Sequence, residues 1–140
     1  ILMHMQGTPQ TMQKDPYYED VVREVRDQLH LRIEYALTNG IDAERIMIDP
    51  GIGFGKTIEH NLQLLRGLSS FKSLDRPILM GTSRKSFITK TVGNEIESRD
   101  WGTAATVAYC IAQGAHAVRV HNVQLCQQVA RMTDAVLRVS

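Results

Sequence analysis

Side chains that could bind an anion or a polar ring stand at one end of each of four apolar runs in this sequence. They are His4 and Gln6, then Asp49, then Ser83 to Lys85, and finally Arg119 with His121. In parallel α/β folds, ligands bind at the carboxyl ends of the strands because the loops converge there. The sequence therefore predicts a ligand site assembled from four strand ends.

The glycine-rich segment Asp49-Pro50-Gly51-Ile52-Gly53-Phe54-Gly55-Lys56-Thr57 is the most informative of these clusters. Its glycines allow tight turns and a close approach of the backbone to a ligand. They run G-x-G-x-G, which does not match the dinucleotide fingerprint G-x-G-x-x-G. Lys56-Thr57 would suit a phosphate-binding P-loop, although Pro50 holds the place of its first glycine. A P-loop-like nucleotide binder and a glycine turn without a ligand both stay open on these residues.

Two further segments carry positive charge. Gly81-Thr82-Ser83-Arg84-Lys85-Ser86-Phe87 passes from an apolar run into a predicted helix start, where free N–H groups and the helix dipole favour an anion. In Arg119-Val120-His121-Asn122, strand alternation turns Arg119 and His121 to the same side. An arginine can bind phosphate oxygens in a bidentate manner. An exposed capped helix and a structural hydrogen-bonded pair are the alternatives for the two segments.

Several classes of function find no support in the residues. The five histidines include no H-x-x-x-H pair around a glutamate, the two cysteines stand apart, and no G-x-S-x-G elbow is present. A formal net charge of +1 without a Lys/Arg cluster gives no footprint for nucleic acid or a membrane surface. Cys110 and Cys126 are expected to be reduced, buried thiols of an intracellular protein.

The elements that must position these residues follow from hydrophobic patterning. The predicted strands are residues 1–5, 45–49, 77–81 and 116–120. The predicted helices are residues 17–39, a helix from Thr57 through Leu68, a short helix from Ser83, residues 101–113 and residues 122–139, with a loop over residues 92–100. Thr57 and Asn122 are expected to cap their helices.

The order is strand then helix, four times over, and the strands are continuously apolar. Such strands belong to a parallel sheet that is covered on both faces, so the fold class is α/β. Four βα units make half of a (βα)₈ TIM barrel, which needs about 250 residues. A small doubly wound sheet is the alternative that the pattern alone leaves open.

The motifs together resemble those of dihydropteroate synthase. Leu2-Met3-His4-Met5-Gln6-Gly7, Asp49 to Lys56, Gly81 to Ser86, and Arg119-Val120-His121 occur in that family's order and spacing, over essentially all 140 residues. The resemblance implies a (βα)₈ barrel in which residues 1–140 supply strands five to eight. It also implies the condensation of 6-hydroxymethyl-7,8-dihydropterin pyrophosphate with p-aminobenzoate to 7,8-dihydropteroate and pyrophosphate, a step of folate biosynthesis that is a sulfonamide target in the family.

The resemblance gives roles to matching residues. It implies catalysis by Lys85, Asp49, Arg119 and His121, pterin binding by Met3, Asp49, Phe54, Gly81, Lys85 and Arg119, p-aminobenzoate binding by Phe54, Lys85 and Ser86, and pyrophosphate binding by Arg119 and His121. It further implies Mg²⁺ with its ligand upstream, a homodimer, and a cytoplasmic location, or an organellar one in a eukaryote.

One residue departs from the pattern, since many members carry aspartate where this chain has Asn122. Ile1 opens a run that already has the character of a strand, so we expect an N-terminal barrel half to precede these residues and to be required for catalysis. A catalytically silent barrel half is the remaining alternative. It predicts loss of Asp49, Lys85 or Arg119, and all three are present.

Overall fold

The computed structural model describes residues 1–139 and contains four short strands among five α-helices. In chain order the elements are β1 (Leu2–Met3), α1 (Val21–Thr38), the 3-10 helix η1 (Ala43–Arg45), β2 (Ile48–Asp49), α2 (Ile58–Arg66), the 3-10 helix η2 (Leu68–Leu74), β3 (Leu79–Met80), α3 (Ser86–Val92), α4 (Ile96–Gln113), β4 (Ala117–Val118) and α5 (Val123–Leu137). No helix among these residues is long and apolar enough to cross a membrane.

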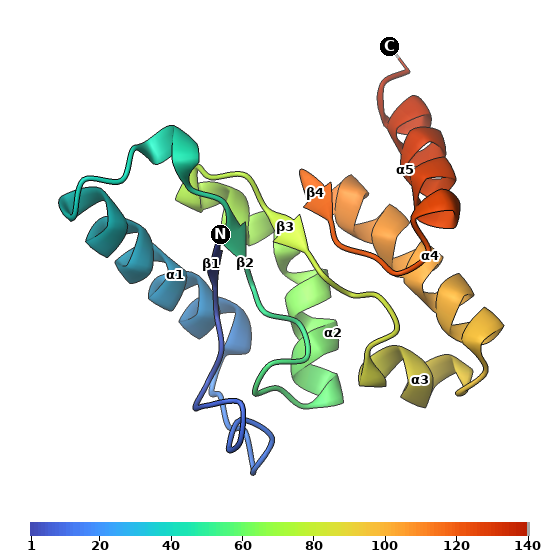
Figure 1. The fold of residues 1–140 in the computed structure, drawn as a ribbon, viewed down its shortest axis with the longest axis horizontal. Helices are drawn as coiled ribbons and strands as arrows, with labels where there is room; N and C mark the ends of the chain where they lie inside the picture. Colours follow the sequence, from blue (N-terminus) through green and yellow to red (C-terminus); the bar gives the residue numbers. More distant parts are fainter. Residues whose placement is uncertain (140) are drawn as a thin grey trace.

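The strands lie side by side in the order of the chain. β1 pairs in parallel with β2, and β3 with β4, while a bridge between Ile48 and Ile78 joins the two pairs. Figure 1 shows this order, with α1 at one side and α4 and α5 at the other. A doubly wound sheet reverses its strand order at a switch point, whereas a βα-barrel keeps chain order. Between the two architectures left open by the sequence, the observed order is that of a barrel.

One apolar core lies between the strands and their helices. Val25, Leu29 and Ile33 of α1 are buried against it, as the helical periodicity predicts, and Ile48 and Ile78 meet them from the sheet. The last helix differs, because only Cys126 of its apolar face is buried and the side chains near its ends are exposed. Among the described helices, α5 packs mainly against α4. Much of the apolar face of α5 is therefore uncovered.

Several predicted boundaries are wrong. The paired strands are shorter than predicted, although backbone bonds such as His4 N–H to Asp49 O at 3.0 Å continue beyond them. α1 begins at Val21 rather than residue 17, because Asp20 caps it by accepting from the Arg23 N–H at 3.0 Å. The predicted loop over residues 92–100 is partly helix, since α4 begins at Ile96. After Ile96 its first residues are polar and either exposed or half-buried, so they lack the apolar period by which a helix is recognised.

The two predicted caps are confirmed. Thr57 accepts a hydrogen bond from the His60 N–H at 3.1 Å, and Asn122 accepts one from the Leu125 N–H at 3.1 Å. The short helix α3 starts at Ser86, not at Ser83, because Arg84 has a positive φ of 54° that no helix residue can hold.

The glycine-rich loop over residues 50–56 is folded around the side chain of Lys56. That side chain is only 4% exposed, and its Nζ donates to the carbonyls of Gly51 at 3.0 Å and Phe54 at 2.9 Å. It also lies 3.0 Å from Nδ1 of His4, which is fully buried at the end of β1. Burial and the Lys56 ammonium lower the pKa of His4 to about 3, so the ring is neutral and can accept this hydrogen bond.

Neighbouring elements hold the same loop from outside. The hydroxyl of Tyr18, just ahead of α1, donates to the Gly55 carbonyl at 2.9 Å. Asn61 of α2 is buried and accepts from the Gly53 N–H at 2.7 Å. The loop, which connects β2 to α2, is therefore a fixed platform at the carboxyl ends of β1 and β2.

Gly51 is required where the loop crosses β1. Its φ is +71°, and a Cβ there would lie 1.8 Å from the carbonyl oxygen of His4. Gly40, after α1, has a comparable φ of +84° but nothing within 4 Å of such a Cβ. The two glycines share the backbone requirement and differ in the collision alone.

We expect Gly51→Ala to lower the free energy of unfolding by about 3 kcal/mol or more, because strain and overlap with the β1 backbone combine. The matched control Gly40→Ala should lose about 1 to 2 kcal/mol from left-handed strain alone. Urea unfolding followed by circular dichroism measures both. Equal losses in the two variants would contradict the close crossing.

The neutral state of His4 predicts acid sensitivity. The unfolded chain protonates this ring near its ordinary pKa of 6.5, whereas the folded chain does so only near pH 3. Between these values the unfolded state binds more protons, so the contribution of His4 to stability is complete above pH 6.5 and is lost as the pH falls. Relative to His4→Asn, the parent should lose about 2 kcal/mol of unfolding free energy between pH 7.5 and pH 5. Parallel stability curves for the two proteins would refute this assignment.

Candidate active site

The strand ends bring most of the predicted site residues together. Asp49 ends β2, and Met3 at the end of β1 is its partner in register. Gly81 follows β3, and the guanidinium of Arg119, just after β4, lies 3.8 Å from where a Gly81 Cβ would be. A pocket of about 260 Å³ opens here, lined by Gly81, Ser83, Lys85, Arg119, Val120 and His121. The convergence expected from parallel strands is confirmed for the residues that follow β3 and β4, whereas none of the described residues at the ends of β1 and β2 lines this pocket.

Asp49 is a buried carboxylate among cations. It is 5% exposed, and its Oδ1 accepts a hydrogen bond from the Gly51 N–H at 2.8 Å. Burial raises the pKa of the Asp49 carboxyl, and this hydrogen bond together with the positive charges of Lys85 and Arg119 opposes the rise. A carboxylate held in this way matches a ligand edge that presents paired N–H donors.

Lys85 links the glycine-rich loop to the pocket. Its Nζ lies 4.5 Å from the centre of the Phe54 ring and donates to the Ile52 carbonyl. A Cβ at Gly53 would lie 3.0 Å from the Lys85 Cδ, so that glycine leaves room for the chain. Burial lowers the pKa of the Lys85 amine to about 8, with Asp49 opposing the shift and Arg119 adding to it. Its ammonium is thus a donor that can give up a proton close to neutral pH.

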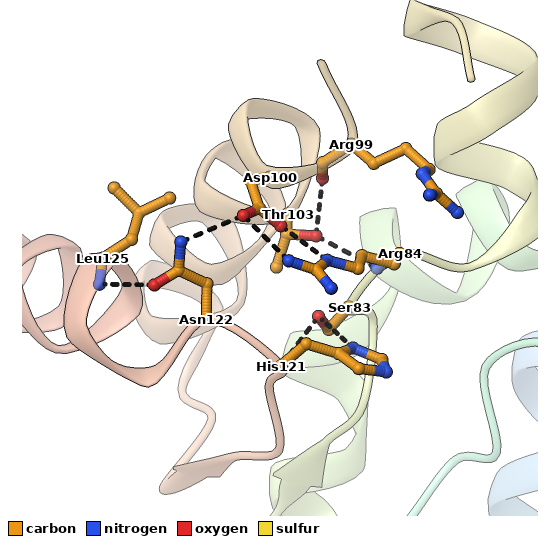
Figure 2. A network of polar contacts seen from close by, with 8 residues as sticks. All are labelled: Ser83, Arg84, Arg99, Asp100, Thr103, His121, Asn122 and Leu125. Carbon is orange, nitrogen blue, oxygen red and sulfur yellow. Dashed lines mark hydrogen bonds and ion pairs between the residues drawn. The ribbon is translucent and has the colours of Figure 1, made fainter. Parts of the chain in front are cut away.

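Ser83 and His121 form a polar pair on the pocket wall. The Ser83 Oγ is 2.8 Å from Nδ1 of His121 and accepts from the His121 backbone N–H at 3.1 Å. Figure 2 shows the two side chains facing one another. Sequence reasoning placed Ser83 in the cluster without giving it a role. Its hydroxyl at a strand end, two residues before Lys85, was the available signal.

Not every predicted residue lies on the pocket wall. Ser86 is exposed at the first position of α3, and Met3 is half-buried on the far side of Asp49. Phe54 contributes through its ring beneath Lys85. The roles expected of Met3 and Ser86 therefore stay predictions.

Lys56 and His4 were not assigned to the site, yet they fix its platform. A P-loop lysine must reach a bound phosphate, whereas the Lys56 ammonium is turned into its own loop and hydrogen-bonded there. Burial lowers its pKa to about 7, which Asp49 opposes and Lys85 reinforces. The P-loop alternative does not fit this geometry.

The donor set here does not suit Mg²⁺, which prefers carboxylates, phosphates and water in octahedral array. Asp49 faces the cations Lys85 and Arg119 instead of a second carboxylate. Across residues 1–139, no three His, Cys, Asp or Glu side chains come close enough to hold a metal ion. The described site is instead cationic around one carboxylate, which favours a ligand that carries both an anion and a polar planar ring.

Known proteins of a single family are similar to this chain in sequence and in fold. The profile of the pterin binding enzyme family matches residues 1–121. The dihydropteroate synthase of Synechocystis is 45% identical over 139 residues, which are 99% of this chain and 48% of that protein. The chain thus spans about half the length of the curated relatives it matches.

Solved structures agree with the sequence relatives. The crystal structure of Yersinia pestis dihydropteroate synthase with a sulfonamide drug complex has a TM-score of 0.94 at 36% identity, over 97% of this chain and 50% of that one. The Xanthomonas albilineans enzyme in complex with 7,8-dihydropteroate has a TM-score of 0.89 at 39% identity, over 99% of this chain and 51% of that one. These relatives give the chain a TIM-barrel α/β fold. With its strand order, its cationic pocket and the match over residues 1–121, the chain belongs to the family of pterin binding enzymes.

Proposed function

We propose that these residues form the C-terminal half of a dihydropteroate synthase barrel, strands five to eight, and carry the larger part of its substrate site. The observation that supports this most is the pocket lined by Lys85, Arg119 and His121 at the strand ends, with the buried carboxylate of Asp49 close enough to feel the charges of Lys85 and Arg119. A buried carboxylate among cations brings little net stability compared with apolar packing, so its presence supports a substrate-binding role over a catalytically silent barrel half.

The geometry suggests how the substrates are held. The pterin would place its guanidine-like edge on the Asp49 carboxylate, with Lys85 at its polar rim and Met3, Phe54 and Gly81 as walls. Its pyrophosphate would lie against Arg119 and His121, which line the same pocket. The p-aminobenzoate would occupy the side formed by Phe54, Lys85 and Ser86. In this arrangement the pterin and the p-aminobenzoate lie on opposite sides of Lys85.

The reaction needs a stabilised leaving group more than a strong base. The C–O bond between the pterin methylene and pyrophosphate breaks, and its electron pair leaves with the pyrophosphate oxygen. The aniline nitrogen forms the new C–N bond and then releases one proton to solvent. Arg119 and His121 would stabilise the negative charge that develops on the departing oxygen, where such donors have their largest effect.

The remaining expectations also belong to this proposal. The upstream barrel half would complete the sheet and supply the ligands of any Mg²⁺, since the described residues do not fit that ion. A homodimer and a cytoplasmic or organellar location follow from the family resemblance.

The test joins residues 1–140 to the upstream half of the Synechocystis relative and follows p-aminobenzoate-dependent pyrophosphate release. Asp49→Asn and Lys85→Ala should each lower kcat/KM by about 100-fold or more, because each removes a charged partner of the substrates. Lys90→Ala, which changes an exposed lysine of α3, is the matched control and should keep the parental rate. Undiminished release by the Asp49 and Lys85 variants would contradict the proposed roles, and a folded parent without release would contradict the proposed function.

A further inference from the structure

Arg84 holds a strained conformation between two residues of the pocket wall. Its φ of +54° lies in the left-handed region, which a non-glycine residue rarely adopts. Ser83 and Lys85, on either side of it, both line the pocket. A strained residue of this kind persists only when its surroundings hold it in place, and such residues concentrate at functional sites.

The surroundings that hold Arg84 come from the start of α4. Its guanidinium binds both carboxylate oxygens of Asp100, with Nε to Oδ1 at 2.8 Å and Nη2 to Oδ2 at 3.1 Å. Its backbone N–H donates to Oγ1 of the buried Thr103 at 3.1 Å. A bidentate pair of this kind fixes direction as well as distance, because the planar fork fits the carboxylate in one orientation.

Asp100 extends the connection to the next strand end. Its Oδ2 also accepts from the Nδ2 of Asn122 at 3.0 Å, while the Asn122 Oδ1 caps α5. Asn122 directly follows His121, whose ring meets Ser83. Figure 2 shows Arg84, Asp100 and Asn122 in one continuous row beside the Ser83 and His121 pair. The loops after β3 and β4 are therefore tied together by side chains that do not line the pocket.

We propose that Arg84, Asp100 and Asn122 form a positioning clamp that sets the spacing between Lys85 on one loop and His121 on the other. This inference rests on the proposed function, in which those two residues act on the two ends of one substrate. The charges within the clamp balance, because the Arg84 guanidinium pairs with the Asp100 carboxylate. The neutral amide of Asn122 donates to the same carboxylate. It acts through Lys85 and His121 and touches no substrate itself.

The two ends of the Asp100–Asn122 contact can be exchanged. Asp and Asn have nearly the same shape, and either can cap a helix, so Asn122→Asp preserves the cap of α5. Many family members carry aspartate at this position, but in this chain it would replace the donor by a second carboxylate facing Asp100. Asp100→Asn removes the charge that holds Arg84. The double exchange restores one carboxylate and one amide across the contact between positions 100 and 122, but it leaves Arg84 with one acceptor oxygen at position 100 instead of two.

In the joined barrel described above, Asn122→Asp and Asp100→Asn should each lower kcat about tenfold, because misplacement of acting groups affects the transition state most. KM for the pterin pyrophosphate should change less than threefold, since every substrate contact remains. The double exchange should recover part of the lost kcat, because it restores the contact between positions 100 and 122 but not the bidentate pair with Arg84. Asn94→Asp, which adds a charge at an exposed position between α3 and α4, should leave both constants unchanged. Parental kcat in both single variants, or no recovery in the double exchange, would overturn the clamp.

A second measurement separates the clamp from the proposed function. The ¹⁵N shifts of the His121 ring, assigned by comparison with His121→Gln, report its contact with Ser83 whether or not the protein turns over substrate. Each single variant should move these shifts toward those of a free histidine, and the double exchange should return them in part. Unchanged ring shifts in folded single variants would reject the clamp, even if pyrophosphate release established the synthase. An inactive parent with the expected ring shifts would reject the proposed function and support the clamp geometry.

Discussion

The buried ammonium of Lys56 is the interaction on which the rest of the site depends. A charge removed from water is costly unless its hydrogen bonds are satisfied, and here two loop carbonyls and the ring of His4 satisfy them. The carbonyls must therefore turn inward, which forces the tight path through Gly51. That same path places the Gly51 N–H on Asp49 and presents the Ile52 carbonyl to Lys85. Lys56 does not line the pocket, yet the loop that it holds orients both Asp49 and Lys85.

Electrostatics at the site follow from the same burial. Burial raises the pKa of Asp49 and lowers the pKa values of Lys56 and Lys85, because it disfavours the charged form of each group. The attraction between the carboxylate and the two ammonium groups opposes these shifts. The result is one carboxylate balanced against several cations, with Arg119 exposed at the mouth. An arrangement with surplus positive charge gains most from a ligand that brings its own anion, as the proposed pyrophosphate substrate does.

The sequence predicted the four strands and the polar residues that follow them, because continuous apolar runs and the polar residues at their ends are local signals. It also predicted the caps Thr57 and Asn122, which are equally local. It did not predict the roles of Lys56, Asn61 or Ser83, because each depends on a partner far along the chain, such as His4 for Lys56. The first turns of α4 were not predicted for a related reason. Asp100 binds Arg84 and Asn122, which are distant in sequence, and such contacts leave no apolar periodicity in the helix itself.

The four strands form two tightly joined pairs with a thinner connection between them. Side chains tie β1 to the loop after β2 through His4 and Lys56, and tie the loops after β3 and β4 through Ser83 and His121. Among the described residues, the pairs are joined by the bridge between Ile48 and Ile78 and by the side chain of Lys85, which contacts the Ile52 carbonyl and the Phe54 ring. Asp49 belongs to the first pair and the pocket to the second. Lys85 is therefore the side chain that couples the carboxylate to the anion pocket, so its placement decides whether the two can act on one molecule.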